Sequence, residues 1–190
     1  MVKSILLVGV GGQGTILASK ILTTGLMEAG YDVKMSEIHG MSQRGGSVSS
    51  QVRYGEKVYS PVVEIGGADI IISFELMEAL RWLDYLKPSG KVVVNNYKLA
   101  PMPVSMGQAE YPDDIIDVLC DAADTSVVNA AEIASELGNP KVMNIVLLGT
   151  VIKAMGLTSI KWDDIIARLV KPAFVDINQK AIKAGIAAVE

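Results

Sequence analysis

The chain has 190 residues, half of them hydrophobic and 20% charged, which is enough apolar material for one domain with a packed core. Its 17 basic and 21 acidic residues give a net charge of −4, and no segment is strongly basic, so nucleic acid is excluded as a principal partner. A single cysteine and a single histidine exclude an internal disulfide, an iron–sulfur cluster and a transition-metal site built from this chain alone. We expect one domain over residues 1–190.

The first residues carry no clear targeting signal. Lys3 and the short apolar run after it are interrupted by glycines too soon to form a signal peptide. No uninterrupted apolar run is long enough to cross a bilayer. The single cysteine, Cys120, is typical of a reducing compartment. We therefore expect a cytoplasmic protein.

The N-terminal part alternates strands and helices. Residues 4–8 form a continuous apolar run, which predicts a strand buried on both faces. Apolar residues at helical spacing predict a helix over 13–29, which Gly30 ends. Residues 32–36 predict a second short strand. This order of strand, helix and strand is the beginning of a parallel sheet.

The middle of the chain predicts a mixed sheet. Residues 47–54 form a strand pattern, and a turn at Gly55 leading into residues 57–59 predicts an antiparallel hairpin. The elements expected further along are a buried strand at 68–74, a helix at 75–86, a strand at 90–96 and a proline-containing loop at 97–112.

The C-terminal part is rich in helices, expected at 130–137, 140–155, 162–170 and 172–189. The helix over 140–155 is apolar nearly all round, so it lies either at the centre of this chain or beneath another chain. Met102 and Met106 in the long loop favour contact with a partner. The fold class is α/β: a three-layer α/β/α arrangement with a Rossmann-like, mostly parallel sheet, an antiparallel hairpin and a helix-rich C-terminal part.

The most informative motif is G-x-G-x-x-G at Gly9, Gly11 and Gly14, between the first strand and the first helix. Such glycines permit a tight turn, a close backbone approach to a ligand, and close packing of the helix on the strand. With Gly12 and Gln13 they present helix N-terminal amides to an anion. A dinucleotide, another anionic ligand and packing alone all stay open from this pattern.

An acidic residue about 20 positions further on would hold a ribose in a dinucleotide site. Glu37 satisfies that spacing. The segment after it, IHGMSQRGGSVSSQVRYG, nevertheless enters a polar, glycine-rich loop and a hairpin rather than a crossover helix. This departure argues against NAD.

The second loop contains a run of candidate binding residues. Arg44 can hold a carboxylate or phosphate through two parallel hydrogen bonds, and Gly45 and Gly46 permit close approach. A solvated connection with an incidental arginine is the alternative. His39 has no evident partner for a catalytic triad, so no catalytic residue is predicted.

Both loops follow strands that we expect to be parallel, and crevices form at the carboxyl ends of such strands. We therefore expect the two loops to lie on one edge of the sheet as a single anion-facing rim. Its predicted binding residues are Gly9, Gly11, Gly12, Gln13, Gly14, Ser42, Gln43, Arg44, Gly45 and Gly46.

Three segments carry a resemblance to a known family. In order, GVGGQGTILASKIL, SEIHGMSQRGGSVSSQVRYG and ADIIISFE resemble the gamma-type subunit of 2-oxoacid:ferredoxin oxidoreductases. The GMSQRGG form of the loop at 40–46 favours the small (beta) subunit of the indolepyruvate type. The distinctive motifs cover residues 4 to about 75, and the helical remainder is compatible with the family without being diagnostic.

The resemblance implies a hetero-oligomeric oxidoreductase. A large partner subunit would hold thiamine diphosphate and 4Fe-4S clusters, coenzyme A would be a co-substrate, and electrons would pass to ferredoxin. One cysteine agrees with this division, and Asn95–Asn96 lacks the preceding Gly-Asp-Gly of a thiamine site. The resemblance implies an isolated chain that is inactive and leaves its self-association open. The alternatives are a stand-alone NAD-dependent oxidoreductase and a non-enzymatic anion-binding scaffold.

Overall fold

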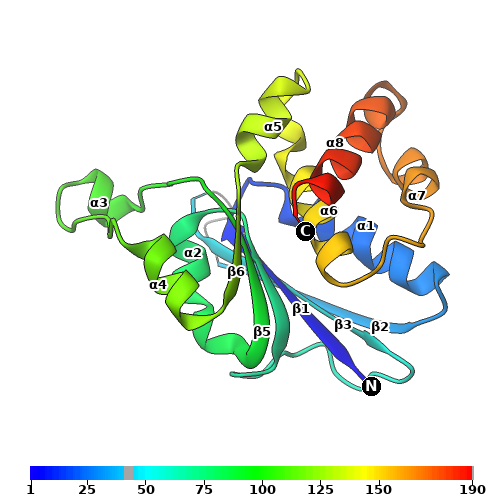
Figure 1. Cartoon of the computed structure of the whole chain (residues 1–190), viewed down its shortest axis with the longest axis horizontal. Helices are drawn as coiled ribbons and strands as arrows, with labels where there is room; N and C mark the ends of the chain where they lie inside the picture. Colours follow the sequence, from blue (N-terminus) through cyan, green and yellow to red (C-terminus); the bar gives the residue numbers. More distant parts are fainter. Residues whose placement is uncertain (41–44, 190) are drawn as a thin grey trace.

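The computed structural model describes residues 1–40 and 45–189. Their centre is a six-stranded mixed sheet with the strand order β2-β3-β1-β4-β5-β6 (Figure 1). The strands are β1 Lys3–Val10, β2 Asp32–His39, β3 Ser47–Gly55, β4 Ala68–Ser73, β5 Leu86–Asn95 and β6 Asp124–Val128. Strand β3 is antiparallel to both of its neighbours, and β1, β4, β5 and β6 are parallel to one another. Strands β1 and β2 therefore point the same way.

Helices cover both faces of the sheet, which confirms the predicted three-layer α/β fold (Figure 1). The helices are α1 Thr15–Glu28, α2 Leu76–Arg81, α3 Met102–Ser105, α4 Ile115–Ala122, α5 Ala130–Glu136, α6 Met143–Ala154, α7 Trp162–Leu169 and α8 Val175–Ala187. One face carries α1 and α5 to α8, and the other carries α2 and α4. Short 3-10 turns span Leu83–Tyr85, Pro140–Val142 and Pro172–Phe174.

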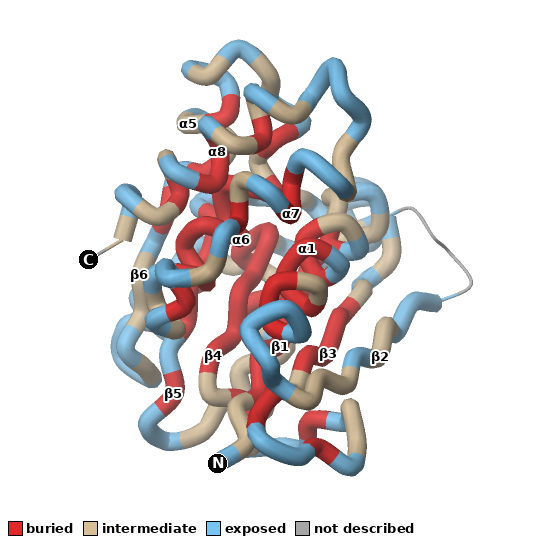
Figure 2. The backbone as a smooth tube through the Cα atoms, turned by 90° about the vertical axis from the view of Figure 1, so that its right-hand side faces the viewer, coloured by how far each residue is buried: buried red, intermediate tan, exposed pale blue. Residues whose placement is uncertain are grey.

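Strand β1 shows why the sheet is buried on both sides. Ile5 and Leu7 join the large core under the C-terminal helices, whereas Leu6 and Val8 join a smaller cluster on the opposite face. Because successive side chains of a strand point to opposite faces, a continuous apolar run suits only a strand in the middle layer. The buried segments of β1 and β4 are visible in Figure 2.

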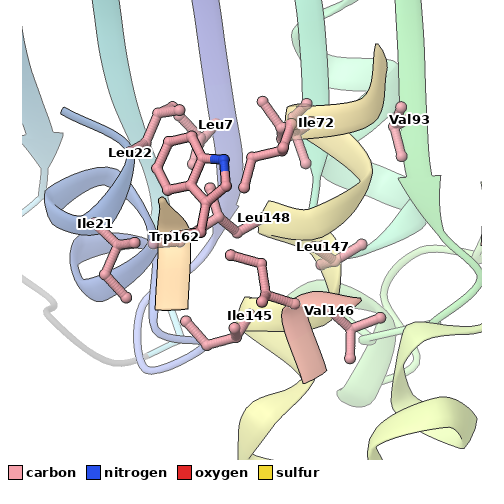
Figure 3. Packing of buried hydrophobic residues seen from close by; sticks show 14 of the residues in the cluster. Leu7, Ile21, Leu22, Ile72, Val93, Ile145, Val146, Leu147, Leu148 and Trp162 are labelled. Atoms are coloured by element: carbon pink, nitrogen blue, oxygen red, sulfur yellow. The ribbon is translucent and has the colours of Figure 1, made fainter. Parts of the chain in front are cut away.

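Helix α6 is the most deeply enclosed helix element described. Every residue from Asn144 to Ile152 is buried, and Leu147 and Leu148 lie among side chains from the sheet, α1 and α7 (Figure 3). Of the two positions that the sequence left open for this helix, the structure shows the central one. Its apolar circumference is covered by elements of the same chain.

Three local expectations differ from the structure. Residues 57–59 form no strand, because Val58 instead donates its N–H to the Asp32 carboxylate at 3.0 Å; the antiparallel hairpin is β2 with β3. The helix expected over 75–86 ends at Arg81 and continues as a 3-10 turn into β5. Helix α4 and strand β6 were not anticipated, because β6 is only five residues long and its apolar pattern is short.

The crossing of α6 and α8 gives the first prediction. A Cβ at Gly185 would lie 1.9 Å from the carbonyl oxygen of Val146, and one at Gly149 would lie 2.3 Å from that of Ile182. Gly185→Ala should therefore lower the free energy of unfolding by about 2–3 kcal/mol, because overpacking outweighs the gain in helix propensity.

Urea unfolding measures this loss. Gly40→Ala is the control, because a Cβ there meets no described atom within 4 Å. Equal midpoints for Gly185→Ala and the wild type would show that the two helices can separate without cost.

Candidate anion-binding rim

The first glycine turn is held by its own glutamine. The backbone N–H of Gln13 donates to the Val10 carbonyl at 3.1 Å, while Gln13 Oε1 accepts from the Val10 N–H at 2.7 Å. Gln13 Nε2 donates to the carbonyl of Phe74 at 3.3 Å. These contacts fasten the turn to the ends of β1 and β4. The side chain of Gln13, a predicted binding residue, is therefore directed into the fold rather than toward a ligand.

The glycines of this turn have different structural uses. A Cβ at Gly9 would lie 2.9 Å from Phe74 Cβ, and one at Gly14 would lie 2.6 Å from Asn144 Nδ2. These two positions permit close packing. Gly12 has a φ of +104°, a backbone conformation that favours glycine, and a Cβ there would meet no described atom within 4 Å. Gly12 is thus the position that leaves room for a ligand.

The two glycine loops meet at the carboxyl edge of β1. The N–H of Gly11 donates to the Gly46 carbonyl at 2.9 Å, and the N–H of Gly45 donates to the Gly11 carbonyl at 3.3 Å. The structure therefore brings the first turn together with Gly45 and Gly46. The other predicted residues of the second loop, Ser42, Gln43 and Arg44, lie outside the described residues.

A cavity of about 300 Å³, here called the glycine cavity, opens beside this junction. It is lined by Gly11, Gly12, Gly14, Thr15, Ile16, Glu37, Ile38, His39, Val48, Ser49 and Ser50. Ser49 Oγ is buried and has no hydrogen-bond partner among the described residues. Ser49 lies opposite Val8 in the ladder, so its hydroxyl points to the face of the sheet away from α1 and does not face the cavity. The start of α1 contributes the positive end of a helix dipole to the same space.

Glu37 is placed differently from the ribose-binding acidic residue of a dinucleotide-binding fold. In that fold the second strand lies next to the first, whereas in this chain β3 separates β2 from β1. Glu37 Oε1 also accepts a hydrogen bond from Ser19 Oγ at 3.2 Å. The residue lines the glycine cavity, but it reaches that cavity from two strands away and with an oxygen already engaged.

Sequence analysis missed a buried carboxylate beside the second loop. Glu78, in α2, accepts hydrogen bonds from Ser47 Oγ, from Arg81 Nε at 3.0 Å and from Trp82 Nε1 at 3.2 Å. Since Ser47 directly follows Gly46, the carboxylate fastens the end of the loop to the opposite layer. The signal for it was a glutamate in the apolar segment just after a buried strand.

The second loop also borders a larger hollow on its other side. A cavity of about 580 Å³ lies between Gly45, α2 and the segment that includes Met102. Met102 and Met106 are 73% and 61% exposed. The segment 97–112, predicted as a loop, contains the short helix α3, and it places Met102 in solvent next to the glycine loops.

The described part of the chain was searched for metal-ligand clusters and for helices that could span a membrane. Residues 1–40 and 45–189 contain no group of three or more His, Cys, Asp or Glu side chains placed to hold a metal ion. The single cysteine, Cys120, is exposed in α4. Within the same residues, no helix is both long and apolar enough to cross a bilayer.

Comparison with known proteins defines the class. Residues 4–188 match the pyruvate ferredoxin/flavodoxin oxidoreductase family. The chain is 39% identical to the indolepyruvate oxidoreductase subunit IorB of Thermococcus kodakarensis, over 97% of this chain and 95% of that protein. It is 40% identical to the subunit of the same name from Pyrococcus horikoshii, with the same coverage. The chain belongs to the pyruvate ferredoxin/flavodoxin oxidoreductase family.

Solved structures agree in fold. The gamma subunit of a keto/oxoacid ferredoxin oxidoreductase from Geobacter sulfurreducens aligns with a TM-score of 0.72 at 22% identity, covering 98% of this chain and 97% of that one. A 2-oxoglutarate:ferredoxin oxidoreductase from Magnetococcus marinus aligns with a TM-score of 0.74 at 20% identity, and the match spans 31% of its longer chain. In that enzyme the same fold therefore occupies one part of a larger polypeptide.

Glu75, the N-cap of α2 at this edge of the sheet, gives a pH-dependent prediction. Burial raises the pKa of its carboxyl from the usual 4.5, and hydrogen bonds from the N–H groups of Glu78 and Met77 act in the opposite direction. A raised pKa means that the folded state holds the proton more tightly than the unfolded chain. The stabilisation is complete below pH 4.5 and is lost as the pH rises through the folded pKa.

Glu75→Gln should remove this loss of stability at higher pH, because the amide does not ionise, and it keeps a side-chain oxygen that accepts from the helix N–H groups. Urea unfolding between about pH 4 and 8 should show a flatter profile for the variant, with Glu136→Gln as the exposed control. Parallel profiles for the wild type and Glu75→Gln would contradict the assignment.

Proposed function

We propose that this chain is the small subunit of an indolepyruvate:ferredoxin oxidoreductase. The observation that carries the proposal is full-length similarity to relatives of one name: four IorB subunits are 36–40% identical over 95–97% of the chain. The common gamma subunits of pyruvate/ketoisovalerate oxidoreductases are only 26–27% identical over 96% of it. The difference favours an aryl 2-oxoacid as the substrate of the complex.

The proposed complex oxidatively decarboxylates its 2-oxoacid. The oxoacid loses carbon dioxide, the acyl group passes to coenzyme A, and two electrons leave one at a time to ferredoxin. A large partner subunit holds thiamine diphosphate and the 4Fe-4S clusters, because one cysteine cannot ligate a cluster and Asn95–Asn96 lacks the preceding Gly-Asp-Gly of a thiamine site. The proposal includes a cytoplasmic location, which the free cysteine favours.

Within the complex this chain is proposed to contribute the anion-binding rim. The support is the open backbone at Gly12 and the helix start at Thr15 beside one cavity. The ligand chemistry is a phosphate of coenzyme A or the carboxylate of the oxoacid. Arg44 and its neighbours Ser42 and Gln43 remain part of the proposed rim on sequence grounds.

Partner contact is proposed through the long loop at 97–112. Its exposed methionines, Met102 and Met106, are unbranched apolar side chains that adapt to an irregular surface. Met102 lines the cavity that borders Gly45. Docking of the large subunit there would place it next to the rim.

The purified chain should be inactive alone and should gain activity with indolepyruvate, coenzyme A and ferredoxin when co-purified with its large subunit, measured anaerobically. The reason is that the residues needed for electron transfer are supplied by the partner. Turnover of the oxoacid by this chain alone, or turnover with NAD as acceptor, would contradict the division of labour and favour the stand-alone dehydrogenase.

Two variants of Ile16 that differ only in charge test whether the rim binds an anion. Ile16 is 58% exposed and lines the glycine cavity at the first turn of α1. Ile16→Glu should raise the KM for the anionic ligand about fivefold relative to Ile16→Gln, because an added carboxylate repels the anion by about 1 kcal/mol near the surface.

The same variant should not destabilise the fold. A carboxylate in the first turn of a helix interacts favourably with its dipole, so Ile16→Glu should unfold at the same urea concentration as Ile16→Gln or slightly higher. Equal KM values for the two variants, for both coenzyme A and the oxoacid, would place the anion site elsewhere.

A further inference from the structure

The carboxylate of Glu78 is buried, although two of its three hydrogen bonds need no burial. The residue is only 3% exposed. It accepts from Arg81 Nε at 3.0 Å and from Trp82 Nε1 at 3.2 Å, and these donors lie three and four residues further along the same segment. Contacts at this spacing form equally well on the surface of a helix. Burial of a carboxylate is costly, and an apolar side chain would fill the same place without that cost.

The third hydrogen bond is the only one that this carboxylate accepts from another element of the described chain. It comes from the hydroxyl of Ser47, the first residue of β3. The pairing of Ser47 with Val10 is the last pair of the ladder between β1 and β3. The ends of strands open most readily, and a hydrogen bond to a charged acceptor is stronger than one between neutral groups. The buried charge is therefore placed where the ladder opens most easily.

The residues just before Ser47 have few contacts of their own in the described structure. Gly45 and Gly46 have no side chains, and Gly45 has a φ of +78° with no described atom within 4 Å of a built Cβ. Among the described residues, their backbone contact with the first turn consists of two hydrogen bonds to Gly11, at 2.9 and 3.3 Å, of which the second is long. The position of both glycines therefore depends on the residue that follows them.

The first glycine turn is fastened to the same short segment as the second loop. Gln13 Nε2 donates to the carbonyl of Phe74 at 3.3 Å, and Phe74 lies where the chain leaves β4 for α2. Glu75, which is 1% exposed, caps α2 by accepting from two of its N–H groups. The segment from Phe74 to Glu78 is thus a firm base for both loops, the first through Gln13 and the second through Ser47.

We propose that Glu78 is a positioning residue for the anion-binding rim and acts through Ser47. Its carboxylate keeps Gly45 and Gly46 against Gly11, in the conformation in which the two loops form one rim. The contact lies behind the loop, because Ser47 and Glu78 line the cavity of about 580 Å³ and not the glycine cavity. Neither side chain is therefore placed to touch a ligand in the glycine cavity. This role rests on the proposed function of the rim.

Hydrogen exchange of the full chain, followed by NMR, tests the positioning itself. Ser47→Ala and Trp82→Phe each remove one hydrogen bond from the same carboxylate, and Ser47 is exposed, so its variants should fold. Ser47→Ala should speed amide exchange at Gly11 and Gly45 at least about tenfold, whereas Trp82→Phe should change it by less than about twofold. Ser47→Thr keeps a hydroxyl and should restore the wild-type rate.

Steady-state kinetics of the co-purified complex test the consequence for binding. In Ser47→Ala the KM for the anionic ligand should rise at least about fivefold while kcat stays within about twofold. Trp82→Phe should leave both values unchanged, which a merely structural role of the carboxylate does not predict. Glu78→Gln should reproduce the rise in KM, and adding Ser47→Ala to it should raise KM no further, because the two residues act as one contact.

Two results would overturn the proposal: wild-type exchange at Gly11 and Gly45 in Ser47→Ala, or equal KM values in Ser47→Ala and Trp82→Phe for both coenzyme A and the oxoacid. An effect of Ile16→Glu on KM without one of Ser47→Ala would show that the rim binds the anion but does not depend on Glu78. The exchange measurement needs neither the partner subunit nor turnover. A failure of the proposed function would appear separately, as a wild-type complex without turnover of the oxoacid.

Discussion

Helix α6 has no polar face, and covering it on every side determines how the helical layer is built. All nine residues from Asn144 to Ile152 are buried, which requires the sheet below and other helices around and above. Helix α8 crosses it at two glycines, where backbone meets backbone without an intervening side chain. Trp162 of α7 places its ring directly on the backbone of α1, because a Cβ at Gly25 would lie 2.3 Å from that ring. The C-terminal helices thus form one packed unit with α1, and the first polar residue of α6, Asn144, reaches the turn from which α1 begins.

The second constraint is the antiparallel strand β3. It lies between β1 and β2 and is antiparallel to both, so it begins at their carboxyl ends. This position brings Gly45 and Gly46 onto Gly11, where two backbone hydrogen bonds form. The carboxylate of Glu78 holds the loop's end from the other layer. A dinucleotide fold would place a second parallel strand in this position, so the change in topology replaces a ribose site with a rim made of two loops.

The sequence predicted an element well where the spacing of its apolar residues and its length indicate the same type of structure. The continuous apolar run of β1 and the helical repeat of α1 predicted those elements to within two residues at most ends, because burial alone determines them. It was uninformative where an element depends on a distant partner. Residues 57–59 have a strand pattern but bind Asp32 instead, and β6 is short enough that its pairing with β5 decides its conformation. The position of Gln13 was equally hidden, since its inward direction depends on the carbonyl of Phe74.

The glycine motif shows why a spacing rule and a binding site are separate matters. Of its positions, Gly9 and Gly14 are required by Phe74 and Asn144, whose atoms would collide with a Cβ. Only Gly12 combines a positive φ with open space. A protein that binds no ligand at this turn would thus need the same glycines. For this reason packing alone was an adequate explanation of the motif. What separates the two explanations is the surroundings of Gly12: a helix start and a second loop at hydrogen-bonding distance from Gly11. These features converge only through the topology of β3, and so the case for a ligand comes from the arrangement of strands rather than from the motif.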